Sequence, residues 1–294
     1  RPSATRPYPI NVFDPFYGGV AGPLTPFTVT NERRKAVAGY AQDMWEATDS
    51  ISFVAGLRYE HLDQTIDNIR TGQVSRLKRD PLEFRGGGRF RPDPRFAFHA
   101  NWGEGFRANS SVGRDGQAFA PETGKGYEVG AKVVLPSFRA AASWFSVSKR
   151  NILATDPVDV NFLATVGRIR SRGVELDGEV DLARGVRLIG NYAFVDAEAR
   201  DPAFPSADVL NVPRHSGTLQ VFATLPVAGR DLDLSVGGTY VGPRAAALDG
   251  GSLRLEDYVK AKASVAYAVT DRVTARVEVD NILDQTYAQS SYSA

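Results

Sequence analysis

The side chains of this 294-residue chain that could do chemistry are three histidines, a run of alternating carboxylates, and a set of loop aromatics and arginines. His61, His99 and His215 stand far apart in the sequence. We interpret His99 as facing the lumen of the barrel predicted below and the other two as strand-end residues, without metal binding or base catalysis. Ser216 follows His215 directly, but neighbouring residues of a strand point to opposite faces. The two side chains are therefore poorly placed for a catalytic dyad, and we expect no catalytic site and no metal site.

The carboxylates lie in 173–182, where they alternate strictly with apolar residues. Val174, Leu176, Gly178, Val180 and Leu182 share one face of the predicted strand, and the other face carries Glu175, Asp177, Glu179 and Asp181. Four carboxylates on one face cannot be buried without water, because isolated charges are costly to desolvate. They predict a lumen filled with water or with a polar protein plug, and hence a wide barrel.

The same alternation recurs along the chain in about twelve runs, including 231–242, 257–268 and 272–280. Runs of about 10–13 residues match the ~9–11 that a tilted strand needs to cross a bilayer, whereas strands of soluble proteins typically have ~5–6. Short turns are predicted at Ala47–Asp49, Pro92–Pro94, Pro136–Ser137, Ala183–Gly185, Val227–Arg230 and Thr270–Asp271. They alternate with long polar loops at 63–81, 106–125, 151–167, 198–214 and 243–256. This pattern predicts an all-β, antiparallel, up-and-down transmembrane β-barrel with its long loops outside.

Composition excludes several other classes. No apolar stretch approaches the ~20 residues of a transmembrane helix, so a helical membrane protein is excluded. The formal net charge is +1, and Lys and Arg are spread along the strands, which argues against a nucleic-acid partner. The absence of cysteine removes disulfides, zinc–cysteine sites and thiol catalysis.

Several motifs, in order along nearly the whole chain, resemble TonB-dependent outer-membrane receptors, and in particular the siderophore-receptor branch. These motifs are NVFDPFYGG at Asn11–Gly19, YAQDMW at Tyr40–Trp45, GLRYEH at Gly56–His61, NWGEGFRAN at Asn101–Asn109, PETGKGYEVGAK at Pro121–Lys132, RSRGVELDGEVDL at Arg170–Leu182, VPRHSGTL at Val212–Leu219 and NILDQTY at Asn281–Tyr287. Each string alone is weak, and their common order carries the resemblance. In the last motif we expect Asn281 and Asp284 to order a turn through side-chain to backbone hydrogen bonds.

The resemblance implies a 22-stranded barrel closed by an N-terminal plug, of which residues 1–294 hold about twelve strands, the tenth to the twenty-first. On this interpretation the plug and the final strand are absent from the sequence, and residues 1–34 form an extracellular loop. The implied protein is a receptor of the Gram-negative outer membrane, embedded in lipid, that imports a ferric siderophore. It needs no cofactor, and TonB energises it through the plug.

Tight capture of such a ligand needs a concave site with aromatic and polar groups. The candidate ligand-binding residues are the loop aromatics Phe13, Phe16, Tyr17, Phe119 and Phe162, with Arg107 and Arg114 as anion-facing groups. Loop aromatics also commonly pack against neighbouring loops or mark the membrane interface. Two other interpretations remain open at this point: a TonB-dependent receptor for haem, cobalamin or an oligosaccharide, and a smaller barrel porin or enzyme. The sequence does not name the chelator, because its identity depends on loop conformation.

Overall fold

The computed structural model describes residues 3–5, 25–69, 71–156, 159, 162–201, 204–246 and 253–291. Its strands are β1 (Ser3–Thr5), β2 (Thr25–Thr28), β3 (Thr30–Thr48), β4 (Ile51–Asn68), β5 (Gln73–Arg79), β6 (Leu82–Asp93), β7 (Phe96–Arg107), β8 (Glu122–Leu135), β9 (Phe138–Thr155), β10 (Leu163–Ala183), β11 (Val186–Asp201), β12 (Phe204–Asp208), β13 (His215–Val227), β14 (Arg230–Val241), β15 (Arg244–Ala245), β16 (Arg254–Leu255), β17 (Tyr258–Thr270) and β18 (Val273–Asp280). Among the described residues, no helix is long and apolar enough to cross a membrane.

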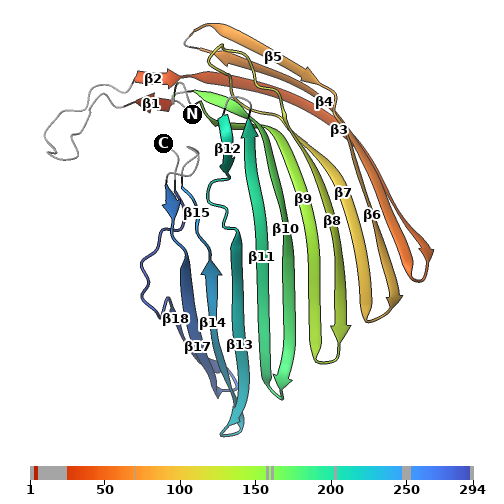
Figure 1. Ribbon diagram of the computed structural model, residues 1–294, viewed down its shortest axis with the longest axis vertical. Coiled ribbons are helices and arrows are strands. Elements are labelled where there is room, and N and C mark those ends of the chain that lie inside the picture. Colours follow the sequence, from red (N-terminus) through yellow and green to blue (C-terminus); the bar gives the residue numbers. More distant parts are fainter. Residues whose placement is uncertain are drawn as a thin grey trace, which may run out of the picture.

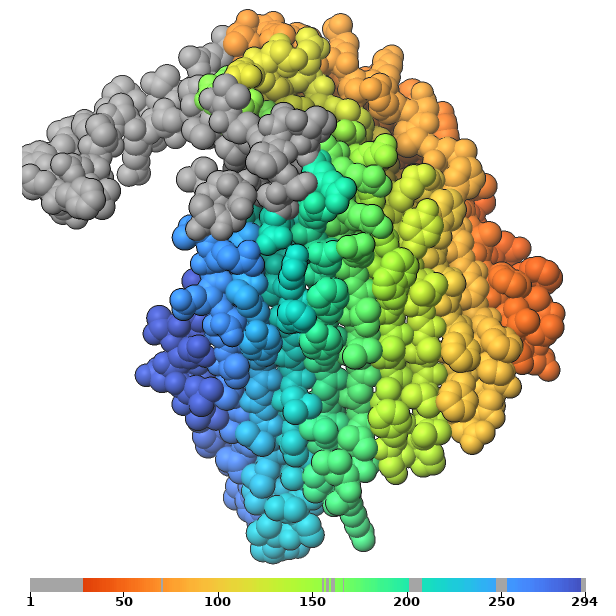
Figure 2. Space-filling view, in the orientation of Figure 1, coloured from red at the N-terminus to blue at the C-terminus, as the bar shows by residue number. Residues whose placement is uncertain are grey.

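The main sheet is antiparallel and follows the order of the sequence. Its twelve-strand path runs β18-β17-β14-β13-β11-β10-β9-β8-β7-β6-β4-β3, with β5 added beside β4 and β12 beside β11. The strands form a curved wall with short turns at one end and longer connections at the other (Figure 1). Figure 2 shows the same strands as neighbouring bands in colour order from orange to dark blue. The predicted up-and-down arrangement of about twelve strands is confirmed, and the count of 22 for a whole barrel stays a prediction.

The two faces of the sheet differ as the alternation predicted. The cross-strand row of Trp144, Val174 and Phe194 belongs to one face, which we call the apolar face. Many of its side chains are exposed in this chain, for example Leu219 at 57%. A face of this kind requires an apolar environment, because soluble proteins rarely expose such large apolar patches.

The opposite face, which we call the polar face, carries the predicted carboxylates. Glu179 Oε1 lies 2.8 Å from Arg139 Nη1 and 3.1 Å from Arg187 Nη1. Arg187 also donates from Nε to Asp181 at 3.0 Å, while Glu175 and Asp177 are exposed. None of the four carboxylates is therefore buried without a partner or solvent, in agreement with the prediction.

The strands extend further into the predicted long loops than the apolar alternation indicated. β4 continues to Asn68, β9 to Thr155 and β11 to Asp201, and β10 begins at Leu163. The reason is that the hydrogen-bond ladder joins backbone groups and does not require apolar side chains. The predicted loops 63–81, 151–167 and 198–214 are thus partly strand. Residues 30–34 belong to β3, and the extracellular position of residues 1–34 stays a prediction.

The apolar pattern of β4 changes faces near its end. Up to Tyr59 the large apolar residues lie on the apolar face, and the next residues on that face are His61 and Asp63. On the other face Leu62 and Ile66 are each only 1% exposed. Such a switch is expected where a strand leaves lipid, because its outer side then meets water and its inner side meets packed loops.

Candidate functional site

Arg107 and Glu122 stand opposite each other where β7 ends and β8 begins, on the polar face near the long loops. Arg107 Nη2 lies 2.5 Å from Glu122 Oε2, and Lys149 Nζ on β9 lies 3.1 Å from Glu122 Oε1. The Glu122 side chain is 9% exposed, whereas those of Arg107 and Lys149 are 72% and 51% exposed. Two cations share one carboxylate, so the cluster presents a surplus positive charge at an accessible surface.

Lys149 was not among the candidates drawn from the sequence. It pairs in register with Gly124, two residues from Glu122 on the same face of β8. Neighbouring strands β8 and β9 are joined by a short turn, so counting back from that turn places Lys149 on the polar face. That register argument was the available signal.

The segment 108–121, which follows β7, is held in a defined conformation by Asn109, which is 4% exposed. Its Nδ2 donates to the carbonyl oxygens of Ala120 at 2.7 Å and Asn151 at 2.9 Å. Gln64 on β4, which is fully buried, donates from Nε2 to the Asn109 carbonyl at 2.8 Å. These bonds close the segment on itself and tie it to β4 and β9.

The same segment is tied to the β4–β5 extension by further bonds. The Ala118 backbone N–H donates to Ser75 Oγ at 2.7 Å, and Gln73 Nε2 donates to the Asp115 carbonyl at 3.1 Å. Val112 of the segment is 6% exposed and Leu77 of β5 is 8% exposed. The long-loop end of the polar face is therefore a packed structure with its own small apolar core.

Arg114 and Phe119 both lie in this segment. Arg114 Nε is 4.0 Å from Asp156 Oδ2, which links the segment to the residue after β9; Asp156 itself is 7% exposed. The half-buried Phe119 ring lies against Gly113, since a Cβ on that glycine would be 3.4 Å from the ring. Both guanidinium groups of the candidate set thus face carboxylates, and Phe119 packs within its own loop.

Phe162 lies on the β9–β10 connection and is half-buried. The Asp156 N–H donates to the Phe162 carbonyl at 2.9 Å, and the Phe162 N–H donates to the Asp159 carbonyl at 3.0 Å. Asp156 therefore joins Phe162 and Arg114 in one cluster. The candidates Phe13, Phe16 and Tyr17 lie outside the described residues. Contact of any of the seven candidates with a ligand stays a prediction.

The three histidines each have a partner of their own. His99 Nε2 on the polar face lies 2.9 Å from Glu128 Oε1, as expected for a lumen-facing residue. His61 Nδ1 lies 2.6 Å from Asp80 Oδ1, and this hydrogen bond holds the pKa of Asp80 below its usual value. Among the described residues, no group of three or more histidine, aspartate or glutamate side chains could hold a metal ion.

His215 and Ser216 lie on opposite faces of β13, as predicted. His215 Nδ1 lies 2.7 Å from Tyr192 Oη on the apolar face. In the last motif, Asn281 Nδ2 donates to the Gln285 carbonyl at 3.1 Å, and the Gln285 N–H donates to Asn281 Oδ1 at 3.3 Å. Asn281 therefore orders the turn with its side chain, as the sequence indicated, whereas Asp284 takes part through its backbone N–H, which donates to the Asn281 carbonyl at 2.8 Å.

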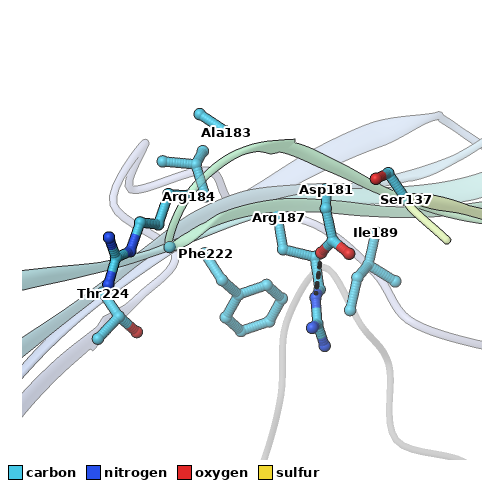
Figure 3. A pocket seen from close by; sticks show the side chains of 10 residues that line it. Ser137, Asp181, Ala183, Arg184, Arg187, Ile189, Phe222 and Thr224 are labelled. Carbon is cyan, nitrogen blue, oxygen red and sulfur yellow. Dashed lines mark hydrogen bonds and ion pairs between the residues drawn. The ribbon is translucent and has the colours of Figure 1, made fainter.

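A hollow lies at the short-turn end of the polar face, with a volume of roughly 830 Å³. Figure 3 shows Arg187 bonded to Asp181, with Ile189 and Phe222 pointing to the same side. Ile189 and Phe222 are each 37% exposed. Asp181 and Arg187 neutralise each other there, and Arg184 also lines the hollow. The hollow lies at the short-turn end, away from the long loops, so it is not among the ligand-binding candidates.

Comparison with known proteins gives consistent matches. The sequence profile of the TonB-dependent receptor-like β-barrel family matches residues 2–282. The metal-pseudopaline receptor CntO of Pseudomonas aeruginosa is 29% identical over 98% of this chain and 42% of the relative. The ferrichrome outer-membrane transporter and phage receptor of Escherichia coli is 31% identical over 97% of this chain and 38% of the relative. The chain thus spans about two fifths of the length of these relatives.

Solved structures show the same fold. The siderophore receptor PiuA from Acinetobacter baumannii superposes with a TM-score of 0.77 at 18% identity, covering 92% of this chain and 42% of the other. The ferric yersiniabactin uptake receptor FyuA from Yersinia pestis gives a TM-score of 0.74 at 19% identity, covering 92% and 44%. At these identities the likeness concerns the fold alone.

Proposed function

Because the chain belongs to the TonB-dependent receptors, as part of their β-barrel domain, we propose that the whole protein imports a ferric siderophore with energy supplied through TonB. The family is one of outer-membrane barrels of Gram-negative bacteria. Its members are receptors and transporters, which excludes the porin and enzyme interpretations. In such a barrel the apolar face contacts lipid, the polar face lines the lumen, and the long loops lie outside the cell.

The observation that carries the proposal is the cluster of Arg107, Glu122 and Lys149 at the extracellular end of the lumen. Its surplus positive charge is exposed and lies beside a packed loop, which suits capture of a bulky anionic chelate. A carboxylate buried between two cations also fixes their positions, so little side-chain entropy is lost when a ligand binds. Phe162 and Arg114 lie on the neighbouring loops and extend this surface.

The relatives support a metal chelate as the ligand class. Two of them are named for metal-pseudopaline and ferrichrome. The described residues offer no paired extracellular histidines of the kind expected for haem, because His61 is bonded to Asp80. A ferric siderophore is therefore favoured over haem, cobalamin and oligosaccharides.

The test is a calorimetric titration of the full-length receptor in detergent with a ferric hydroxamate, a ferric catecholate, haem and cobalamin. Calorimetry is preferable to tryptophan fluorescence, because Trp45, Trp102 and Trp144 all lie on the apolar face. We expect saturable binding of one ferric chelate below 1 µM, on the order of −8 kcal/mol or stronger. Saturation by haem or cobalamin alone would refute the proposal.

A variant pair locates the site. Replacing both Arg107 and Lys149 with glutamine should weaken binding of the ferric chelate at least tenfold, because the surplus charge is lost. Lys132→Gln is the control, since Lys132 lies on the same face of β8 but near the short-turn end. An equal loss in both proteins would place the ligand elsewhere.

A further inference from the structure

Three cross-strand rows of polar residues lie on the apolar face at the extracellular end of β9, β10 and β11. Above the row of Trp144, Val174 and Phe194, each further step of two residues stays on the same face. The rows, in order, are Ser146–Arg172–Asp196, Ser148–Arg170–Glu198 and Arg150–Arg168–Arg200. The outward surface of three neighbouring strands is therefore rich in arginine.

The carboxylates on this surface neutralise only some of the arginines. Arg172 Nη2 lies 2.9 Å from Asp196 Oδ2, and Arg200 Nη2 lies 2.7 Å from Glu198 Oε2. Arg168 donates from Nε to the uncharged Ser148 Oγ at 2.8 Å. Among the described residues, no carboxylate forms an ion pair with the three exposed arginines that form the unneutralised patch: Arg150, Arg168 and Arg170.

Outward-facing cations also occur at the long-loop end of β3 and β5, where Arg33, Lys35 and Lys78 lie beside β4. On β4 the corresponding outward positions are occupied by His61, Asp63 and Asp67. Asp63 there pairs with Lys78 at 3.4 Å. These cations therefore provide a matched charge control for the patch.

The height of the patch on the wall matches the lipid headgroups. Trp144 and Phe194 lie on the apolar face below the patch, and Tyr127 lies one row higher, level with Arg172. Aromatic residues of this kind mark the membrane–water interface. The patch begins at Arg170, two residues above the row of Tyr127, about 7 Å at the usual rise of a strand. The arginines thus stand at and above the phosphate level of the outer leaflet.

A shallow apolar groove lies below the patch, on some of the same strands. Gly178 on β10 pairs with Gly190 on β11, and Gly190 pairs with Leu219 on β13. The missing side chains lower the surface, leaving a hollow of roughly 780 Å³ lined by Leu176, Gly178, Gly190, Tyr192, Leu219 and Gly238. On a surface that faces lipid, such a hollow offers packing contacts to a hydrocarbon chain.

We propose that the patch and the groove together bind one phosphorylated lipid of the outer leaflet. Its phosphates lie against Arg150, Arg168 and Arg170, whose guanidinium groups match phosphate geometry. One of its acyl chains lies in the groove beside Gly178. The site is separate from the ligand-binding cluster of the lumen, because the two open onto opposite faces of the sheet.

The test uses the full-length receptor in detergent, with retained lipid counted by native mass spectrometry after titration with lipid A carrying two phosphates. Combining Arg150→Gln, Arg168→Gln and Arg170→Gln should weaken retention on the order of 100-fold, since each basic residue near such a surface contributes about a factor of five. Retention equal to that of the unaltered receptor would overturn the proposal.

The matched control removes three positive charges from the same face of the sheet at another place. Arg33→Gln, Lys35→Gln and Lys78→Gln together change the net charge by the same amount, on β3 and β5. The receptor with these three control substitutions should retain as much lipid as the unaltered receptor. A loss equal to that of the patch variant would show a nonspecific charge effect and overturn the site.

Two further arms test the headgroup and the groove. Lipid A lacking one phosphate should bind more weakly, and inorganic phosphate at equal concentration should not displace the lipid; displacement would mean a free-anion site instead.

Gly178→Leu fills the groove, and a Cβ at Gly178 meets no atom within 4 Å, so the variant should fold. It should lower lipid retention at least fivefold while leaving binding of the ferric chelate unchanged, and unaltered retention would refute the acyl-chain part.

Discussion

Arg244 lies over the ring of Tyr258, with its Cζ atom 5.4 Å from the ring centroid, and Tyr258 in turn stacks on Tyr287 at 4.2 Å between centroids. Arg244 is only 2% exposed. Its guanidinium group donates to the carbonyl oxygens of Gly242, Glu256, Ala288 and Gln289. One buried cation therefore joins the β14–β17 connection to the segment after β18, and backbone dipoles satisfy its donors.

Arg244→Met should destabilise this junction by about 3 kcal/mol, because several buried carbonyl groups lose their donor. Arg244→Lys should restore little, since a compact ammonium cannot replace a planar fork that also stacks on Tyr258. The measurement is thermal unfolding of the full-length receptor, with limited proteolysis to detect release of residues 284–291. Arg254→Met is the control: Arg254 is exposed, and its ion pair within the described residues is with Asp208, so its loss should cost under about 0.5 kcal/mol.

Asn109→Ala should loosen the segment 108–121. The variant leaves the carbonyls of Ala120 and Asn151 without their donor, at a cost of about 1–3 kcal/mol. Hydrogen exchange of the amides in 108–121 should quicken by one to two orders of magnitude, and a ferric chelate should bind more weakly. Asn101→Ala, on the exposed polar face of β7, should change neither. Unchanged exchange in the first variant would show that backbone bonds alone hold the loop.

Glu122→Gln tests the shared carboxylate. It leaves Arg107 and Lys149 close together without the charge that holds them, so we expect a loss of about 1–2 kcal/mol in thermal stability of the long-loop end. An anionic chelate should bind at least as tightly as before, because the local charge becomes more positive. The control is Glu175→Gln, at an exposed residue of the polar face on β10. It should change the thermal stability by less than about 0.5 kcal/mol. Weaker chelate binding in Glu122→Gln would mean that the fixed positions of the two cations matter more than their surplus charge.

The wall of the barrel could be predicted from the sequence because alternation fixes the face of every residue once the strand is known. The range 231–242 became β14 at Arg230–Val241, and 272–280 became β18 at Val273–Asp280. Prediction of the strand ends was less accurate where apolar alternation stopped. There the β4 ladder continued over Leu62–Asn68 with the apolar residues on the other face.

The candidate site was predicted only in part, for a related reason. Arg107 was predicted in the loop 106–125, whereas in the structure it ends β7. Its partner Glu122 and the neighbouring Lys149 came from register between strands, which a single run does not reveal. The arginine rows of β9–β11 were missed because each strand contributes only a few of them, and the surface emerges only when three registers are combined.

The β6–β7 turn should titrate with acid at an unusually low pH. Arg95 donates to both Asp93 oxygens from its side chain, at 2.8 and 3.0 Å, and from its backbone N–H at 2.9 Å. These bonds lower the pKa of Asp93 from 3.8 to about 2. Because the folded pKa is depressed, the stabilisation is complete above about pH 4 and is lost as the pH falls towards 2.

The chemical shift of the Asp93 side-chain carboxyl carbon would report this titration in the detergent-solubilised receptor. The signal is assigned by its loss in Asp93→Asn. Arg95→Gln should move the midpoint upward, towards the ordinary aspartate value, because the side-chain bonds are removed. A midpoint near 4 in the unaltered protein would contradict the assigned hydrogen bonds.

The β13–β14 hairpin has the last feature with a clear test. Its two central residues, Ala228 and Gly229, have φ values of 50° and 78°, which is the left-handed geometry of a two-residue hairpin turn. Gly229 adopts this geometry freely, whereas for Ala228 it costs about 1 kcal/mol. Asparagine tolerates this region and is favoured before glycine in such turns, so Ala228→Asn should stabilise the hairpin by about 0.5–1 kcal/mol. Gly229→Ala should destabilise it by at least as much. Thermal unfolding of the two full-length variants should therefore shift in opposite directions, and a shift of the same sign in both would show that the turn adopts another geometry.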